Sequence, residues 1–418
     1  MTLYLLLFFV CGVWALDLDY VLKSAIKNSP ELDAIRQDLL SARASLDAEK
    51  QLYLPEVFLS YRLNYNSEKQ SFQMPAFGGA TFQTSKQSYS TLQGGLRYFI
   101  FDGGSRAGLV ETATSNLRSK NFLYEEKLQS LKLEVIQAYF DVLSAKALIE
   151  AIEKQKEAVE VQLKTAQAFY ERGLVAITDV LQARVRLAEV ERDLRQAIGN
   201  YKLALGNLSR LSALAEDQLT HLQEPKVEID IKPLDYYLEA AGKRNLLQAQ
   251  REAVEISKAQ RKVFKSQFYP KIFLEALYTY SDQNPAIKPK GLFSLSLGLS
   301  LSFQGIRPYF QEISAQYLEL KAQREYQDLL EKIKLDTKKA YEEVLTAKDN
   351  LKVSEEALAF AEKFFELSKE QYLNQLISQR ELLEAEASLT RARINRIISY
   401  YQLLKSYHRL LFVSGLGN

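Results

Sequence analysis

Residues 138–146, AYFDVLSAK, return as residues 340–348, AYEEVLTAK, in a chain of 418 residues. At the same separation, the stretch that begins at Tyr170, YERGLVAITDVLQA, returns as the stretch that begins at Tyr372, YLNQLISQRELLEA. A repeat unit of about 200 residues is too long for a solenoid repeat and indicates a duplicated architecture. What each copy contains therefore decides the fold.

Both copies contain long stretches without proline, which is absent between Ala76 and Glu224 and again after Pro308. Because proline breaks helix interiors, these stretches permit very long helices. A helix of about 68 residues over 105–172 would be on the order of 100 Å long. Its apolar residues alternate at spacings of three and four, which is typical of coiled coils. They are Leu128, Leu131, Val135, Ala138, Val142, Ala145, Ile149 and Ile152.

The long helices are expected to end at matching points. Gly173 suits a left-handed C-cap. In the second copy Asn374-Gln375 occupies that place, and Asn is the next-best residue for the left-handed conformation. Each copy is thus predicted to hold a long helix, a tight turn and a returning helix of about 35 residues. We expect a first repeat over 16–213, a polar, proline-bearing linker over 214–233 and a second repeat over 234–418.

Two segments, 56–101 and 271–303, change to a period of two, which predicts a strand hairpin in each. The strands are about 10 residues long, the length that crosses a bilayer as a tilted strand. An apolar face opposite a small polar face is what the wall of a membrane β-barrel needs. A soluble sheet with one face on a core is the alternative, but a helix-dominated chain offers no obvious second layer. The clearest apolar face is Leu295, Leu297, Leu299, Leu301 and Phe303.

Four strands cannot close a barrel, and open sheet edges are not tolerated in lipid. The chain must therefore oligomerise, with two copies giving eight strands and three giving twelve. The first hairpin is longer by thirteen residues, which we assign to the polar loop 67–88, opposite the short loop 282–291. Long loops lie on the outer surface of such barrels.

The first 15 residues are predicted to be a secretory signal peptide. The run is almost wholly apolar and ends in Val13-Trp14-Ala15, a small-residue cleavage pattern. The only cysteine, Cys11, lies within it, so the mature chain would have neither disulfides nor thiol–metal sites. A lipid anchor on Cys11 is the alternative, although the preceding Phe9-Val10 lacks the small residues expected there.

Other chemistry finds little support in the sequence. The net charge of +2 gives no support for nucleic-acid binding. The only histidines, His221 and His408, are far apart and are interpreted as structural, so we expect no metal and no cofactor. There is neither a nucleophile elbow nor a phosphate-binding loop of the G-x-x-x-x-G-K-[ST] type. The glycines of FDGGSR, 101–106, are interpreted as a strand-to-helix turn. We expect that the protein is not an enzyme.

The duplicated unit, the signal segment and the turn GLVAITDV at 173–180, followed by LQA, resemble the TolC family of outer-membrane efflux ducts. The resemblance implies a mainly α-helical α+β fold. It implies a homotrimer with a 12-stranded transmembrane β-barrel, four strands per chain, above a long periplasmic α-helical coiled-coil barrel. The location would be the outer membrane of a Gram-negative-type bacterium, with an extension into the periplasm.

The function implied is that of an exit duct in a tripartite efflux or type I secretion system. Partners would be outer-membrane lipid, a periplasmic adaptor (membrane fusion) protein and an inner-membrane pump of the RND, ABC or MFS class. Two alternatives are a periplasmic coiled-coil adaptor and a structural envelope protein without a pore. Neither needs four strands of lipid-crossing length together with matched helix breaks.

The resemblance also implies a periplasmic gate built from rings of acidic residues and a few tethering side chains. The first-copy aspartate falls on Asp179 and the tethering tyrosine on Tyr372. The acidic ring positions fall on Glu381 and Glu384. Rings of carboxylates in a narrow pore favour cations. Capping of the returning helix is the alternative role for Glu381, and a helix-start role is the alternative for Asp179.

The tethering arginine position of the family falls on Ile377, which is a departure from the family pattern. Arg380, one turn away, is a candidate replacement. The resemblance further implies that the two helix turns dock to the adaptor. The residues are Gly173, Leu174 and Val175 in the first turn and Gln375, Leu376 and Ile377 in the second.

Overall fold

The computed structural model describes residues 16–302 and 305–417, so the expected signal peptide, with Cys11, lies outside the described residues. The chain divides into two compact units. The first comprises residues up to Arg36, Leu123–Leu247 and Asp328 onward. The second comprises Gln37–Phe122 and Gln248–Gln327. Each unit is considered by itself.

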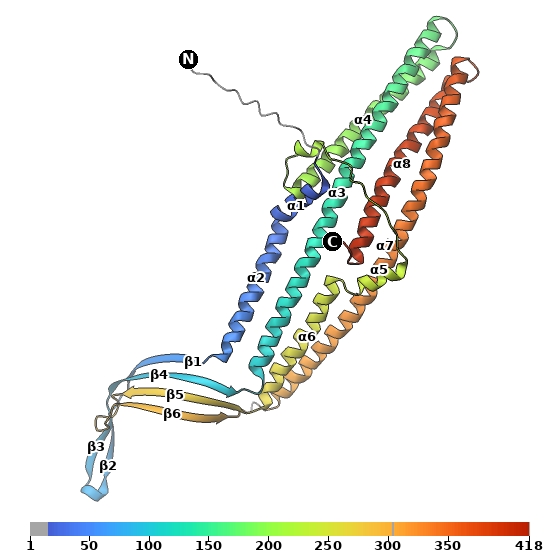
Figure 1. Ribbon diagram of the computed structural model, residues 1–418. Coiled ribbons are helices and arrows are strands. Elements are labelled where there is room, and N and C mark those ends of the chain that lie inside the picture. Colours follow the sequence, from blue (N-terminus) through green and yellow to red (C-terminus); the bar gives the residue numbers. More distant parts are fainter. Residues whose placement is uncertain (1–15, 303–304, 418) are drawn as a thin grey trace, which may run out of the picture. The chain divides into compact units, whose positions relative to one another are not determined.

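Helices dominate the chain (Figure 1), as predicted. The two longest, α3 and α7, have 67 residues each and correspond between the copies. The only proline in either is Pro308, in the first turn of α7, where its missing N–H is tolerated. The helices are α1 Leu18–Asn28, α2 Pro30–Lys50, α3 Ser105–Glu171, α4 Ile177–Ser212, α5 Leu234–Ala241, α6 Asn245–Lys265, α7 Arg307–Leu373 and α8 Gln379–Val413.

No α-helix in the described part of the chain combines the length and the apolar character needed to cross a membrane.

The second unit contains a four-stranded antiparallel sheet in the order β1-β4-β5-β6 (Figure 1). Pairing of β4 with β5 joins the hairpins of the two copies, and β1 and β6 form the two edges. The last strand begins at Gly291 and ends at Ser300, three residues earlier at each end than the predicted alternation from Ser294 to Phe303, and Phe303 lies outside the described residues. The strands are β1 Glu56–Tyr65, β4 Ser88–Phe101, β5 Lys271–Ser281 and β6 Gly291–Ser300.

The two faces of this sheet differ as the period of two predicts. Apolar side chains on one face are exposed to solvent in the single chain, for example Leu59 at 78% and Leu297 at 71%. Phe58, Arg97 and Phe273 lie half-buried on the opposite face, where Arg97 lies near both rings. The sheet therefore has an outer apolar face and an inner face of mixed polar and aromatic character.

Sequence analysis described 67–88 only as a long polar loop. In the structure this loop carries a second hairpin, β2 Gln70–Met74 with β3 Ala80–Ser85. The tip turns through Gly78 and Gly79, whose φ angles of 69° and 80° suit glycine. At its base, Lys86 pairs with Asp282 at 2.9 Å and ties the loops of the two copies together. That amine and the backbone N–H of Ser90 hold the pKa of Asp282 at about 2.

The main core of the first unit lies where the repeated AYFDVLSAK stretch packs. Tyr139 and Phe140 are fully buried there, among apolar residues of α1, α4 and α8. The Tyr139 hydroxyl donates to the backbone carbonyls of Leu16 and Gln223. Leu16 also forms a parallel bridge with Leu222. The start of the described chain is thus fixed against the linker.

Candidate functional site

The first helix turn, between α3 and α4, closes with a Schellman motif. Gly173 takes the left-handed conformation, with φ of 71°, and its N–H donates to the carbonyl of Tyr170 at 2.9 Å. The N–H of Leu174 donates to the carbonyl of Phe169 at 2.9 Å. Nothing lies within 4 Å of where a Cβ on Gly173 would project. Glycine is needed here for its backbone freedom and not for space.

The second turn, between α7 and α8, repeats this geometry with a different residue. The left-handed residue is Gln375, with φ of 60°, and the N–H of Leu376 donates to the carbonyl of Gln371 at 2.8 Å. The propensity of Asn374 for this conformation is therefore not used. Its side chain instead donates to the carbonyl of Glu370 at 3.0 Å. The alignment of the two copies, which places Gln375 opposite Gly173, identifies the left-handed residue correctly. The preference of asparagine for that conformation does not.

Both turns present an exposed leucine followed by a half-buried aliphatic residue. Leu174 is 48% exposed and Leu376 is 72% exposed. Val175 and Ile377, which follow them, are half-buried. The two turns therefore offer matching apolar tips, and all six predicted turn residues lie in these two places.

Tyr372 is buried near the second helix turn. Its ring lies 5.8 Å from that of Phe169, which joins the ends of α7 and α3. Burial first, and then the negative charge of Asp179, raise the pKa of Tyr372. Among the described residues its hydroxyl has no hydrogen-bond partner. The structure thus places Asp179 and Tyr372 in electrostatic range without a hydrogen bond between them.

Glu381 forms a capping box with Ser378 at the start of α8. The N–H of Glu381 donates to the Ser378 hydroxyl at 3.3 Å, and the N–H of Ser378 donates to the Glu381 carboxylate at 2.7 Å. The hydrogen bonds from the Ser378 backbone and hydroxyl hold the pKa of Glu381 below its usual value. The capping role that sequence offered as the alternative is therefore formed in this chain.

Within one chain, Arg380 pairs with a carboxylate of its own helix. Its Nε donates to Glu384 at 3.0 Å within α8, and the two side chains are 79% and 64% exposed. Both lie beside a groove of 710 Å³ between α4 and α8, whose charged lining also includes Arg186 and Glu189. Glu384 therefore faces this groove already paired with Arg380 of the same chain.

Sequence analysis missed the pair that does connect α4 with α8. The side chain of Glu386 is 2% exposed, and it accepts hydrogen bonds from Nε and Nη2 of Arg186 at 3.4 Å. Thr390 donates to its other oxygen at 2.9 Å. A signal was present, because Glu386 falls in the apolar register between Leu382 and Leu389, where a charge needs a partner.

The residues whose types suggest metal or phosphate binding have structural surroundings. In the part of the chain that is described, no group of three or more His, Cys, Asp or Glu residues could hold a metal ion. Burial lowers the pKa of His408, whose ring lies 5.8 Å from that of Phe140. Asp102 accepts from the backbone N–H of Arg106 at 2.8 Å, and FDGGSR is the predicted strand-to-helix turn between β4 and α3.

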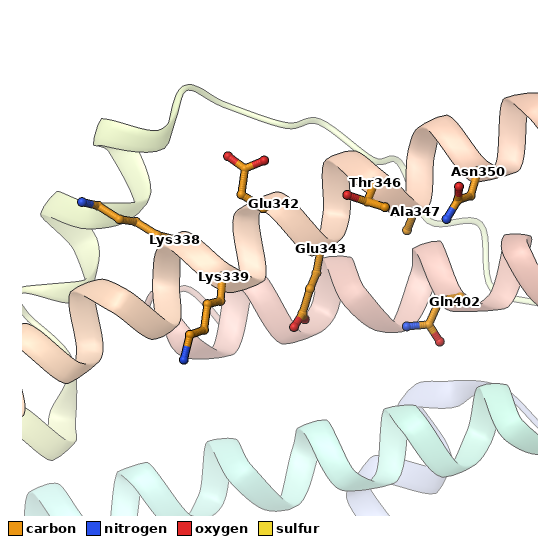
Figure 2. Close-up of a pocket in the computed structure, with 8 residues that line it drawn as sticks. All are labelled: Lys338, Lys339, Glu342, Glu343, Thr346, Ala347, Asn350 and Gln402. Carbon is orange, nitrogen blue, oxygen red and sulfur yellow. The ribbon is translucent and has the colours of Figure 1, made fainter.

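A surface groove of 580 Å³ on α7 is lined by lysine and glutamate side chains (Figure 2). Lys339 and Glu343 point toward the same side of α7, while Glu342 points away from it (Figure 2). Glu343 pairs with Arg409 of α8 at 2.9 Å. The groove is therefore a charged helix surface that carries an interhelical ion pair.

The chain has two helix hairpins with matched Schellman turns. It also has a sheet whose strands are of bilayer-crossing length and carry an apolar outer face. These features define the class of duplicated, mainly α-helical membrane channels. The profile of the outer membrane efflux protein family matches residues 21–214 and 237–416. The chain belongs to this family.

Similar proteins agree with this assignment. The outer membrane protein TolC of Vibrio cholerae is 24% identical over 417 residues, which cover 94% of this chain and 90% of the relative. The outer membrane efflux protein BepC of Brucella suis is 20% identical over 399 residues, covering 93% and 84%. The crystal structure of the outer membrane protein VceC from Vibrio cholerae matches with a TM-score of 0.82 at 19% identity, covering 95% of this chain and 96% of that chain.

The predicted TolC-like, mainly α-helical fold is confirmed. The chain is an outer-membrane efflux duct that extends into the periplasm, and its family is one of channels. The two alternatives without a pore are therefore set aside.

Proposed function

We propose that three copies of this chain close the duct and form the outer-membrane exit of a tripartite efflux or type I secretion system. One observation carries the proposal. The edges of the sheet, β1 and β6, lack a neighbouring strand among the described residues, while the apolar outer face is exposed. Open edges are not tolerated in lipid, so β1 of one copy pairs with β6 of the next. Three copies then supply twelve strands.

The periplasmic entrance is the end that carries the two helix turns. Asp179 and Glu381 lie in the first turns of α4 and α8, and Glu384 follows one turn further along α8, so a trimer brings nine carboxylates to this end. Such a ring attracts cations and slows anions. Arg380 and the capping box moderate this field, because each engages one of the carboxylates. The packing of Tyr372 holds α7 against α3 there.

The matched tips of the two turns are the docking points for a periplasmic adaptor. Leu174 and Leu376 project apolar surface, and the Schellman turns at Gly173 and Gln375 hold them in equivalent positions. The adaptor would connect the duct to an inner-membrane pump of the RND, ABC or MFS class. The duct itself is passive and performs no covalent step.

Single-channel recording tests the acidic entrance. We expect Glu381→Gln with Glu384→Gln to reduce cation selectivity and block by multivalent cations. Glutamine is accepted at the third helical position of a capping box, so the turn is preserved while the charge is removed. Lys363→Gln, on α7 outside the groove between α4 and α8, is a control expected to change neither quantity. Unchanged selectivity in the double variant would exclude the acidic ring, although not the duct.

A further inference from the structure

The inner face of the sheet carries a cluster of aromatic and charged side chains that the gate does not use. Arg97 on β4 donates from Nε to Glu275 on β5 at 2.7 Å, and the two residues are direct partners in the register. The guanidinium carbon lies 5.8 Å from the ring centroid of Phe58 and 5.6 Å from that of Phe273. The ion pair therefore lies between two aromatic rings.

Each ring lies over a glycine of the neighbouring strand. Phe273 is paired with Gly298 of β6, where an added Cβ would lie 2.4 Å from the ring. Phe58 is paired with Gly95 of β4, where it would lie 3.1 Å from the ring. The glycines allow the rings to lie against the sheet, as glycine does where another group approaches the backbone closely. Both phenylalanines are half-buried, so part of each side chain stays exposed.

The cluster takes its side chains from β1, β4 and β5, and its two charges compensate each other. Glu275 is 18% exposed and is paired, and Arg97 is 40% exposed. A surface of aromatic rings and a neutralised guanidinium favours flat aromatic molecules, which stack on both. It offers little to a small ion, because neither charge is free.

We propose that Phe58, Arg97, Phe273 and Glu275 form an aromatic belt inside the barrel, a contact site for flat aromatic solutes that pass through it. The inference rests on the proposed closure of the sheet with its apolar face toward lipid. Three copies repeat the belt around the barrel. The belt binds weakly, as a transit site must, because a solute has to leave as readily as it enters.

The orientation of the belt can be tested with tryptophan probes. The only tryptophan, Trp14, lies in the predicted signal peptide, so the mature chain has none and Phe273→Trp places a single probe on the belt. Leu274→Trp is the matched control, since adjacent strand residues face opposite sides. In bilayers we expect acrylamide to quench the probe at 273 and brominated lipid to quench the probe at 274. The reverse pattern would overturn both the closure of the duct and the belt.

Binding can be measured with caffeine, a neutral, flat and water-soluble aromatic molecule, by the broadening of its proton resonances on the purified oligomer. We expect saturable binding that is about twofold to tenfold weaker in Phe58→Ala and in Phe273→Ala. Leu59→Ala, on the outer face, should bind as the unmodified protein does, and 1,3-dimethylurea should show no broadening. If the quenching pattern holds but caffeine binding is absent, or equal in all variants, the belt is wrong and the duct stands.

Discussion

At the residue scale, the two helix turns show how one backbone geometry is met by two different side chains. Gly173 and Gln375 both have a positive φ and occupy the same place in a Schellman motif. A residue with a Cβ is strained in this conformation by roughly 1–2 kcal/mol. The second turn therefore holds strain that the first does not.

Exchanging these residues should have opposite effects. We expect Gln375→Gly to stabilise its turn by about 1 kcal/mol and Gly173→Gln to destabilise its turn by a similar amount. Hydrogen exchange of the turn amides reports both, as a change of about fivefold in opposite directions. No space is limiting at Gly173, so a much larger loss there would contradict the explanation by backbone strain.

The capping box at the start of α8 predicts a pH dependence with a definite sign. Hydrogen bonds from Ser378 lower the pKa of Glu381 from its usual 4.5. A lowered carboxyl pKa contributes stability that is present above pH 4.5 and is lost as the pH falls through the lowered pKa. Protection of the first α8 amides should therefore fall on acidification. Glu381→Gln should remove this dependence, and an equal dependence in that variant would contradict the assignment.

At the scale of elements, the contact between α4 and α8 depends on an ion pair in the apolar register. Glu386 is almost completely buried, so its charge relies on Arg186 and Thr390. By contrast, the pair of Arg380 with Glu384 is exposed and lies within one helix. Buried pairs are strongly destabilising when one partner is removed, whereas exposed pairs contribute little.

These two pairs give a matched comparison. We expect Arg186→Leu to destabilise the α4–α8 contact by about 3 kcal/mol, because it leaves Glu386 buried without its cation. Arg186→Leu with Glu386→Leu should recover most of that loss. Arg380→Ala should lose only about 0.3–0.5 kcal/mol. The opening free energy of α8, from hydrogen exchange, measures all three, and equal losses for Arg186→Leu and Arg380→Ala would refute the distinction.

The elements that sequence predicted well are those with a long regular pattern. The absence of proline and the coiled-coil spacing predicted α3 and α7, and the alternation through Leu295 predicted β6. The hairpin β2–β3 was missed because 67–88 is polar with glycine and proline, which is typical of a loop. Its order depends on contacts such as Lys86 with Asp282, which join residues far apart in sequence.

The candidate site was predicted less completely than the fold. Alignment of the two copies located the turns at Gly173 and Gln375, and the spacing of Ser378 and Glu381 identified the capping box. The partners of Arg186 and Arg380 could not be chosen from sequence. Helical spacing offers several carboxylates to each arginine, and only packing decides between them.

At the scale of the whole molecule, one chain supplies only part of a duct. Its sheet has two open edges and an exposed apolar face, and its helix hairpins end in matched tips. Each of these features is unfavourable or without use in an isolated chain. Together they support the proposal that copies of the chain surround one axis, with lipid outside the sheet and water inside it.

The most direct test of this account is single-channel recording of the purified oligomer in a planar bilayer. Three chains around one axis should produce discrete, uniform conductance steps, with larger conductance to cations than to anions. A folded oligomer that inserts into the bilayer but produces no steps would contradict the central claim that this chain forms a continuous duct.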